Sequence, residues 1–268
     1  MKKFFALLLT ALMVMSLAAC GSSAKDSDAK YIEKKDKLLI GITIYEPMNY
    51  YDANGNLTGF DTEFAQAVCD KLGLKAEFVE INWDTKEIEL NAKSIDCIWN
   101  GMTITEERAA NMSISYPYVK NAQVVVVKAD SAIASTADLI GKTVVAEIGS
   151  AGEGQIKGDD ANADLAQANY VGLSKQTDCL MEVKAGTADA AVLDWTLAKT
   201  MVGEGTSFSD LKMVDGLELA TEEYGIAFRK GSDFTAKVND TIKALVADGT
   251  LTAMADKYGL ALAPAIAG

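Results

Sequence analysis

The feature that most constrains the fold is a repeated alternation between short apolar runs and longer amphipathic runs. The apolar runs are rich in Val, Ile or Phe, and they cover residues 37–43, 76–80, 94–99, 122–128, 143–148, 188–193 and 224–228. Runs of this length and composition are typical of β-strands. Because amphipathic runs lie between them, the sequence predicts an α/β fold in which helices cover parallel sheets.

Two of the amphipathic runs have a clear helical period. The run from Phe60 repeats an apolar side chain every four residues, with Asp61 as the predicted N-cap and Gly73 as the predicted end. The run from Phe234 does the same, between Ser232 and Gly249. An Asn-Gly pair within residues 49–58 predicts a small hairpin before the first of these helices.

The first 30 residues predict export and anchoring. Residues 1–19 contain two lysines, an apolar run and then small residues, which is the order of a secretory signal peptide. The apolar run is shorter than the roughly 20 residues that a membrane-spanning helix needs. The sequence LAAC at 17–20 resembles the lipobox of bacterial lipoproteins, although a cysteine can also fall in a leader by chance.

We therefore expect Cys20 to carry lipid and to become the mature N-terminus. Residues 20–30 are small, polar and charged, as in a flexible tether. A single acyl chain binds membranes only marginally, so a stable anchor implies more than one chain at Cys20. The predicted location is the extracytoplasmic face of the cell membrane.

The composition argues against several classes of function. The chain has 38 acidic and 25 basic residues and a net charge of −13, so it repels nucleic acid, and we expect no such partner. Histidine is absent, which removes Ser-His-Asp and Cys-His catalysis and the commonest transition-metal ligand. The glycines around Gly149 lack the Lys-Ser/Thr pair of a phosphate-binding loop. We expect neither a metal nor a cofactor.

Three cysteines remain once Cys20 is assigned to lipid, and an odd number excludes a complete disulfide framework within one chain. Cys69 lies on the apolar face of a predicted helix and Cys97 inside an apolar run. Both are therefore interpreted as small buried hydrophobic residues. Cys179 gives no stronger signal.

Arg108 is one of only two arginines, and it follows a loop of residues 100–105 between a predicted strand and a predicted helix. Thr105 is the expected N-cap of that helix. A bidentate guanidinium beside backbone amides at a helix start is well suited to bind a carboxylate. A surface ion pair with a neighbouring acid explains the position of Arg108 equally well, so the residues alone leave both readings open.

Several blocks of sequence between residues 37 and 259 are distinctive. They include GNLTGFDTEFAQAVCDKLGLKAEFV, INWD, IDCIWNGMTITEERA, SYPYV, STADLIGKTVVAEIGSAGE, ADAAVLDWTLA, YGIAFRKG and ADGTLTAMADKYG. In this order they strongly resemble the amino-acid type of bacterial solute-binding proteins, family 3. The resemblance covers nearly the whole chain after the N-terminal segment.

This resemblance implies a type II periplasmic binding protein fold, in which two Rossmann-like lobes are joined by two strands. Lobe one would comprise residues 31–121 and 219–268, and lobe two residues 122–218. Proteins of this class close about a hinge around their ligand. The implied function is to bind a free amino acid, without enzymatic activity and as a monomer, and to deliver it to the permease of an ABC transporter.

The resemblance also implies ligand contacts at Tyr45, Trp83, Asn100, Gly101, Thr103, Arg108, Glu147, Ser150, Ala151 and Asp194. Arg108 matches the arginine that binds the ligand's carboxylate, and Asp194 matches the acid that holds its α-ammonium group. The alternative role of Asp194 is to cap the helix predicted at 195–199, and one carboxylate could do both. Gly101 and Thr103 match loop positions that contact the ligand's main chain, in the loop that Asn100 begins.

The remaining positions match with one departure. The family's Gly-Thr-Thr turn in lobe two is here Gly149-Ser150-Ala151, so one hydroxyl is missing and only the backbone amide of Ala151 can serve. Tyr45 and Trp83 match aromatic positions that sandwich the ligand's side chain. Without the resemblance, both would be interpreted as packing residues.

Two positions bear on which side chain the ligand carries. Relatives that bind lysine or arginine commonly have an acid three residues before the aromatic clamp, where this chain has Ile42. This departure argues against a strongly cationic ligand held in the same way. Glu147 matches a position that faces the ligand's side chain, and a carboxylate there accepts hydrogen bonds and repels acidic side chains. We therefore predict a polar ligand that is neutral or basic, and we exclude aspartate and glutamate.

Two other functions are alternatives. Some relatives of this fold are dehydratases, and without histidine such an enzyme would need Glu147 or Glu46 as its general acid or base. Nothing in the spacing of these two residues demands that role. A sensory ectodomain is the third possibility, but no transmembrane or signalling segment follows Gly268 in this sequence.

Overall fold

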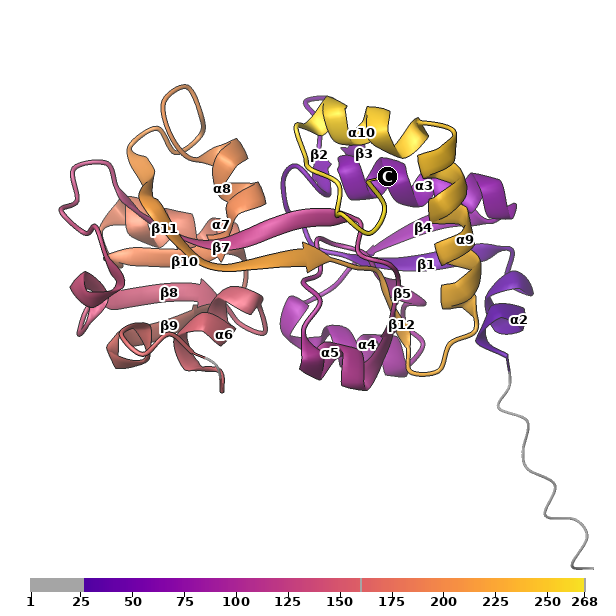
Figure 1. Cartoon of the computed structure of the whole chain (residues 1–268), viewed down its shortest axis with the longest axis horizontal. Coiled ribbons are helices and arrows are strands. Elements are labelled where there is room, and N and C mark those ends of the chain that lie inside the picture. The colour runs from indigo at the N-terminus through magenta and orange to yellow at the C-terminus, as the bar shows by residue number, and fades with distance from the viewer. Residues whose placement is uncertain (1–26, 160, 268) are drawn as a thin grey trace, which may run out of the picture.

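A computed structural model describes residues 27–159 and 161–267, which form two lobes side by side, each built on a five-stranded sheet (Figure 1). The predicted signal peptide, Cys20 and the start of the tether lie outside the described residues. The first sheet has the order β4 (Lys75–Glu80), β1 (Lys37–Ile42), β5 (Cys97–Ile98), β12 (Ala227–Arg229) and β6 (Met112–Ile114). The second has the order β11 (Leu211–Tyr224), β7 (Val119–Lys128), β10 (Ala190–Asp194), β8 (Thr143–Glu147) and β9 (Asn169–Leu173).

The α/β class is confirmed, but the prediction of parallel sheets is wrong in part, since both sheets are mixed. In the first sheet β4, β1 and β5 are parallel, whereas β12 runs antiparallel to β5 and β6. In the second, β10, β8 and β9 are parallel, whereas β7 is antiparallel to both β10 and β11. The antiparallel strands arise because the chain leaves the first lobe and later returns to it.

Two long strands, β7 and β11, make these crossings. They pair antiparallel along their length, with Asn121 opposite Glu222 and Val119 opposite Tyr224. In Figure 1 they form the bridge between the two lobes. The predicted lobe boundaries, 121/122 and 218/219, both fall inside these strands.

In the first lobe, one face of the sheet is covered by α3 (Phe60–Leu72), α9 (Phe234–Ala247) and α10 (Thr250–Tyr258), and α4 (Lys86–Asn91) packs on the other (Figure 1). Phe64 is fully buried and meets Trp99 edge to face, with 5.0 Å between ring centroids. Burial of an aromatic side chain of this size contributes about 1.5 to 3 kcal/mol. The α3 period that was read from the sequence therefore supplies the main core of this lobe.

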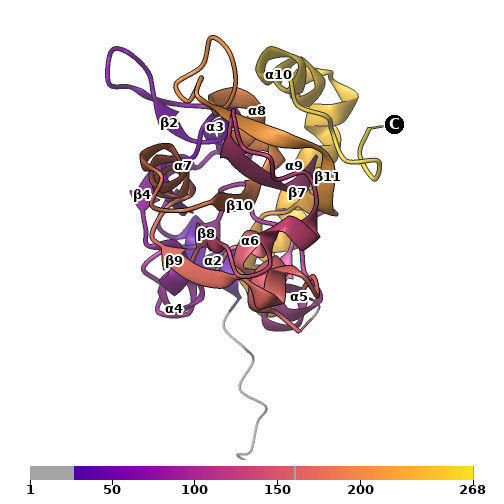
Figure 2. The same cartoon turned by 90° about the vertical axis from the view of Figure 1, so that its left-hand side faces the viewer.

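In the second lobe, the apolar run of β7 is buried on both faces. Val124 and Val126 pack in one core with α7 (Gln176–Ala185), while Val125 and Val127 pack in another with α6 (Ala151–Lys157). Figure 2 shows these two helices on opposite sides of the sheet. Such a strand reads as a continuous apolar run because both of its faces are covered.

Several predicted boundaries need correction. Asp61 does not cap α3, because the helix begins at Phe60 after Gly59 and the Asp61 carboxylate is buried inside the fold. Ser232 is one residue before the true N-cap of α9, Asp233. The run at 224–228 is not one strand, since β11 ends at Tyr224 and β12 begins at Ala227.

Other local predictions are confirmed. Gly73 ends α3 in the left-handed conformation, and Thr105 caps α5 (Glu106–Asn111) by accepting from the Arg108 amide. The predicted hairpin pairs β2 (Tyr50–Tyr51) with β3 (Leu57–Thr58). Strands β6 and β9 and most of β11 were not predicted. The structure also contains short 3₁₀ turns at Trp83–Thr85, Thr136–Leu139 and Leu165–Gln167.

The predicted tether is wrong at its C-terminal end, because helix α2 (Asp28–Glu33) begins within it. Asp28 accepts from Arg229 at 2.8 Å, and Arg229 also pairs with the buried Asp96 at 3.1 Å. The charge and polarity of residues 28–30 suggested a solvated segment, but this ion-pair network docks them on the first lobe. Arg229, the second arginine of the chain, thus has a structural role.

The cysteines of the described residues are buried and free: Cys69, Cys97 and Cys179. This confirms the reading of the first two as small buried hydrophobic residues. Within 27–159 and 161–267, no helix is both long and apolar enough to span a bilayer. The same residues contain no group of three or more acidic, cysteine or histidine side chains arranged to hold a metal.

Candidate functional site

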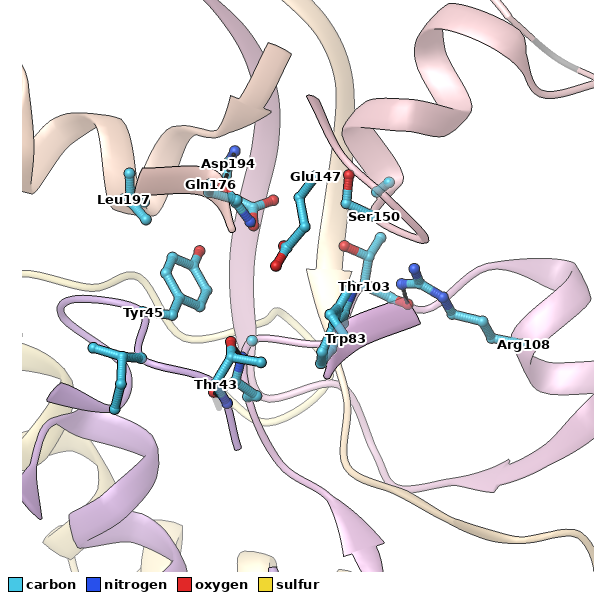
Figure 3. Close-up of a pocket in the computed structure, with 14 residues that line it drawn as sticks. Thr43, Tyr45, Trp83, Thr103, Arg108, Glu147, Ser150, Gln176, Asp194 and Leu197 are labelled. Atoms are coloured by element: carbon cyan, nitrogen blue, oxygen red, sulfur yellow. Dashed lines mark hydrogen bonds between the residues drawn. The ribbon is translucent and has the colours of Figure 1, made fainter. Parts of the chain in front are cut away.

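A cavity lies between the two lobes beside the crossing strands, and all ten residues predicted to contact a ligand line it (Figure 3). Four residues that were not predicted line it as well: Thr43, Ile44, Gln176 and Leu197. The cavity volume is only about 20 Å³, roughly the room that one water molecule needs. An amino acid can therefore enter only if the lobes separate or the lining side chains move.

Arg108 enters the cavity from α5 in the first lobe, at the helix start predicted from Thr105. Its Nη1 donates to the Thr103 carbonyl at 2.8 Å, and its Nη2 donates across the lobes to the Gly149 carbonyl at 2.9 Å. The side chain is buried, and burial lowers the pKa of the guanidinium. The surface ion-pair reading of Arg108 is therefore wrong, because a buried fork that faces the other lobe is not a surface contact.

Lys86 of α4 is a second buried cation, which the sequence did not reveal. Its Nζ donates to the Gly149 carbonyl at 3.0 Å and lies 4.8 Å from the centre of the Trp83 ring. Burial and the charge of Arg108 lower the pKa of the Lys86 amine to about 8. Two cations of the first lobe thus donate to one carbonyl oxygen of the second lobe. A carboxylate oxygen at that point would accept stronger hydrogen bonds than the neutral carbonyl, because both partners would be charged.

The loop from Asn100 to Thr103 is fixed by buried hydrogen bonds. The Gly101 amide donates to Asp61 Oδ2 at 2.7 Å, so this amide is already engaged. Asn100 exchanges hydrogen bonds with Thr43, at 2.9 Å from the Thr43 amide and 2.6 Å to its hydroxyl. Through these hydrogen bonds, Asn100 and Asp61 fix the position of the loop.

Gly101 is required at its position for two reasons. Its φ of 54° lies in the left-handed region, which favours glycine. A Cβ atom there would lie 2.5 Å from the Tyr45 ring, which is too close for any real contact. The loop thus brings its backbone directly against an aromatic side chain of the cavity.

Asp194 ends β10 and faces the cavity from the second lobe. Its Oδ1 accepts from Asn121 at 2.8 Å and from Gln123 at 2.5 Å, and its Oδ2 accepts from Gln176. Asp194 is the N-cap residue of α8 (Trp195–Met201), as its alternative reading expected, but its carboxylate makes no cap hydrogen bond to the helix. The Asn121 amide oxygen makes one instead, accepting from the Thr196 amide at 3.1 Å.

Glu222 on β11 is a second acid of this region and was not predicted. Its Oε1 accepts from the Thr103 hydroxyl at 2.8 Å, from Asn121 at 2.6 Å and from Gln123 at 2.9 Å. Burial and the neighbouring Asp194 charge raise the pKa of Glu222 to about 7. In the sequence it is one of several acids in LELATEEYG, and nothing distinguishes it from the others.

Glu147 ends β8 and extends into the cavity in Figure 3. Only 5% of its surface is exposed. Burial and the Asp194 charge raise the pKa of Glu147 to about 8, while the nearby Lys86 opposes that rise. Glu147 therefore enters the cavity mainly as a neutral carboxylic acid at pH 7, which the sequence could not indicate.

The other predicted positions are also placed in the cavity. The Tyr45 and Tyr224 hydroxyls share a hydrogen bond of 2.6 Å. The Arg108 guanidinium lies 6.0 Å from the centre of the Trp83 ring. The Ser150 hydroxyl accepts from the Glu153 amide at 3.1 Å and caps α6, whose first residue is Ala151.

The arrangement is complementary to a zwitterion. The buried Arg108 guanidinium lies on one side of the cavity, with the Lys86 amine next to the lining residue Trp83, and the Asp194 carboxylate lies on the opposite lobe. Apolar and aromatic groups line the space between, as is usual for small-molecule sites. Glu46, the alternative general acid or base, is not among the lining residues.

Most of the chain is similar in sequence to known solute-binding proteins. Residues 38–261 match the model of the bacterial extracellular solute-binding proteins, family 3. The chain is 33% identical over 261 residues to the arginine-binding extracellular protein ArtP of Bacillus subtilis, covering 96% of this chain and 98% of ArtP. It is 31% identical over 231 residues to the L-cystine-binding protein TcyJ of Escherichia coli, covering 85% and 84% of the two chains.

A solved structure is similar in fold as well as sequence. It is the ancestral amino-acid-binding protein AncCDT-1, described as a precursor of cyclohexadienyl dehydratase. The TM-score is 0.76 at 31% identity, and the match covers 87% of this chain and 99% of the other. The fold and the family resemblance thus agree.

Proposed function

Because this chain belongs to the bacterial extracellular solute-binding proteins, family 3, we infer that it binds a free polar amino acid outside the cytoplasm and delivers it to an ABC transporter. The relatives that support this inference bind arginine or cystine, as their names state. The permease of that transporter is the implied partner.

The observation that carries the proposal is the opposition of Arg108 and Asp194 across one cavity. Both side chains are buried, with 7% and 5% of their surface exposed, and they come from different lobes. We propose that the guanidinium takes the ligand's carboxylate and that Asp194 takes its α-ammonium group. A desolvated charge needs such a partner, so each end of a zwitterion satisfies one buried group of the protein.

Hinge closure follows from the small cavity and the two crossing strands. The Gly149 carbonyl of the second lobe accepts hydrogen bonds from both Arg108 and Lys86. We propose that the lobes separate about β7 and β11, that a ligand carboxylate replaces this carbonyl, and that the lobes close again around the ligand. Motion of this kind is common to two-lobed binding proteins.

The ligand's side chain is proposed to be polar and either neutral or basic. Glu147, Gln176 and Tyr45 line the part of the cavity around Asp194, and buried polar groups disfavour a side chain that cannot pair with them. An acidic side chain there would place a third carboxyl group beside Glu147 and Asp194, and like charges at close range are disfavoured. Arginine and cystine, the ligands named for the two relatives, both fit this class.

A binding function is favoured over an enzymatic one. The relatives compared above are named as binding proteins, although one solved relative is the precursor of a dehydratase. Glu147 is the buried acid that such chemistry would use, and its raised pKa suits a proton donor. Recovery of the bound amino acid unchanged after long incubation would support binding, and a dehydrated product would support the enzyme.

The N-terminal segment supplies the proposed anchor. We propose that the signal peptide of residues 1–19 is removed and that Cys20 is diacylated, which places the two lobes on the outer face of the membrane. The family is extracellular, which agrees with this location. We further propose that the protein acts as a monomer, with one ligand between its lobes.

A thermal-shift screen against the common amino acids and cystine tests the proposed function directly. A ligand that binds only the folded state stabilises it by about 2.7 kcal/mol at a concentration 100 times its Kd. Polar neutral or basic amino acids should raise the melting temperature, and glutamate and aspartate should not. A screen in which no amino acid raises it would contradict the function.

A further inference from the structure

We propose that Glu222, on the second crossing strand, is a positioning residue for the ligand's α-ammonium group. It would hold two acceptors of that group in place: the Thr103 hydroxyl of the first lobe and the Asp194 carboxylate of the second. This inference rests on the proposed function, because it concerns how the amino acid would be held. It adds a residue that does not touch the ligand itself.

The first part of the argument is the bridge between two carboxylates. The Asn121 amide nitrogen lies 2.8 Å from Asp194 Oδ1 and 2.6 Å from Glu222 Oε1. The Gln123 amide nitrogen lies 2.5 Å and 2.9 Å from the same two oxygens. Each NH₂ group has two hydrogens, so each amide can serve both acids at once. The Asn121 amide is also held through its oxygen, which accepts from Thr196. Loss of Glu222 would leave one hydrogen of each amide without an acceptor beside Asp194.

The second part is the direction of the Thr103 hydroxyl. This hydroxyl has one hydrogen, and it donates that hydrogen to Glu222 Oε1 at 2.8 Å. What remains for a ligand is the lone-pair side of the oxygen, which can only accept. An ammonium group is a pure donor, so Glu222 prepares Thr103 for the α-ammonium and against a second acceptor.

The third part is the position of Glu222 between the lobes. It lies on β11 opposite Asn121 of β7, and Thr103 pairs with Tyr224 of the same strand. One side chain on the hinge thus contacts a first-lobe loop directly and a second-lobe acid through two amides. Closing the lobes would complete both halves of the ammonium site around this carboxylate.

Acidic side chains outnumber cationic ones around Asp194 and Glu222, so one more positive charge would be favourable there. Asp194 and Glu222 are two acids that share the same donors, and Glu147 lies nearby on β8. Arg108 is the cation that interacts with both acids. An α-ammonium group would add the missing positive charge and so favour the ionised form of both acids.

The test compares affinities for a matched pair of ligands by calorimetry. The first is the amino acid with the highest affinity in the screen of the common amino acids and cystine. The second is its desamino analogue, with hydrogen in place of the α-ammonium group; for arginine this is 5-guanidinopentanoate. Glu222→Gln should weaken the amino acid about 10- to 100-fold, since a hydrogen-bonded charged group is affected, and should change the analogue less than about threefold.

Glu223→Gln is the control, because it removes the same charge one position along the strand, on its other face. It should leave both affinities within about twofold of the parent. A merely structural role of Glu222 would weaken both ligands in parallel, and that result would overturn the proposal. An affinity of Glu222→Gln for the amino acid equal to that of the parent would also overturn the proposal. In either case the proposed function would stand, because the parent still binds the amino acid.

A double-mutant cycle covers the case in which the analogue binds too weakly to measure or Glu222→Gln fails to fold. In that case Thr103→Val and Glu222→Asp, alone and combined, are measured with the amino acid. If Glu222 acts through Thr103, the combined loss should be at least about threefold smaller than the product of the single losses. A combined loss of affinity equal to the product of the two single losses would show that Glu222 and Thr103 act independently, and would overturn the proposal. A parent that binds no amino acid would remove the proposed function and this inference together.

Discussion

Replacing Glu147 by glutamine should remove a proton that is coupled to the binding of basic ligands. Burial raises the pKa of Glu147 to about 8, so at pH 7 about 90% of the carboxyl groups are protonated. A cationic side chain beside Glu147 would favour the ionised form, because an opposite charge lowers the pKa of an acid. Binding of a basic amino acid should then release close to one proton, whereas binding of a neutral one should not use this route.

The magnitude follows from the distance between the pKa and the working pH. Each pH unit below the pKa adds about 1.4 kcal/mol to the cost of ionising the group. The affinity for a basic ligand should therefore rise about tenfold between pH 6 and pH 7 and level off above pH 8. Asp194 in the cavity and Lys86 and Glu222 next to it also have shifted pKa values, but we expect them to respond to the ligand's main chain, which all amino acids share.

The assay is calorimetry with one basic and one neutral ligand, in buffers that differ in their enthalpy of ionisation. The number of protons released is the slope of the observed enthalpy against the buffer enthalpy. The parent should release more protons with the basic ligand, by about 0.9 at pH 7, and Glu147→Gln should abolish that difference. Equal proton release for both ligands in the parent would refute the proposed position of Glu147 beside the ligand's side chain.

Three further predictions concern the protein without its ligand. Asp61 and Glu147 have raised pKa values of about 7 and about 8, so between pH 5 and pH 7 the folded state holds protons that the unfolded state has released. The free energy of unfolding should therefore fall as pH rises through this range, by about 1.4 kcal/mol per pH unit for each proton. Denaturant titrations at several pH values measure this slope, and Glu147→Gln should reduce it. A free energy of unfolding that rises with pH would contradict this prediction. Gly101→Ala should destabilise the fold by more than about 1 kcal/mol, because φ is positive and the new methyl group meets Tyr45, and a melting temperature equal to that of the parent would contradict the assigned loop geometry. Mass spectrometry of the membrane fraction should find a diacylated N-terminal Cys20, whereas a Cys20→Ala variant with unchanged membrane localisation would exclude the lipid anchor.

Much of the fold could be predicted because its signals are local. The four-residue period of α3, the Asn-Gly turn and the apolar run of β7 each state their structure within about ten residues. Strand β11 gives no such signal. Its 14 residues mix apolar and polar side chains without a regular alternation, and its register against β7 shifts at two places.

Some residues of the site also have a local signal in the sequence, and others have none. Arg108 and Asp194 were predicted because they stand at the ends of recognisable elements within motifs that resemble a family. Lys86, Gln176 and Glu222 lie in ordinary polar stretches. Only the tertiary fold brings Gln176 into the cavity and places Lys86 and Glu222 against residues that line it. The N-terminal start of α2 was missed for a related reason, since its partner Arg229 is 201 residues away in the chain.

The most direct test of the central claim is the affinity of Arg108→Ala for the best amino acid from the screen. Removal of one partner of a buried charge pair costs about 3 to 5 kcal/mol, which is a loss of about two to four orders of magnitude in affinity. Lys157→Ala removes a positive charge that is exposed on α6, paired with Glu153 at 2.7 Å, and serves as the control with unchanged binding. The account predicts that Arg108→Ala loses at least a hundredfold in calorimetry while the control does not. Binding by Arg108→Ala within a few-fold of the parent would show that the ligand's carboxylate is held elsewhere.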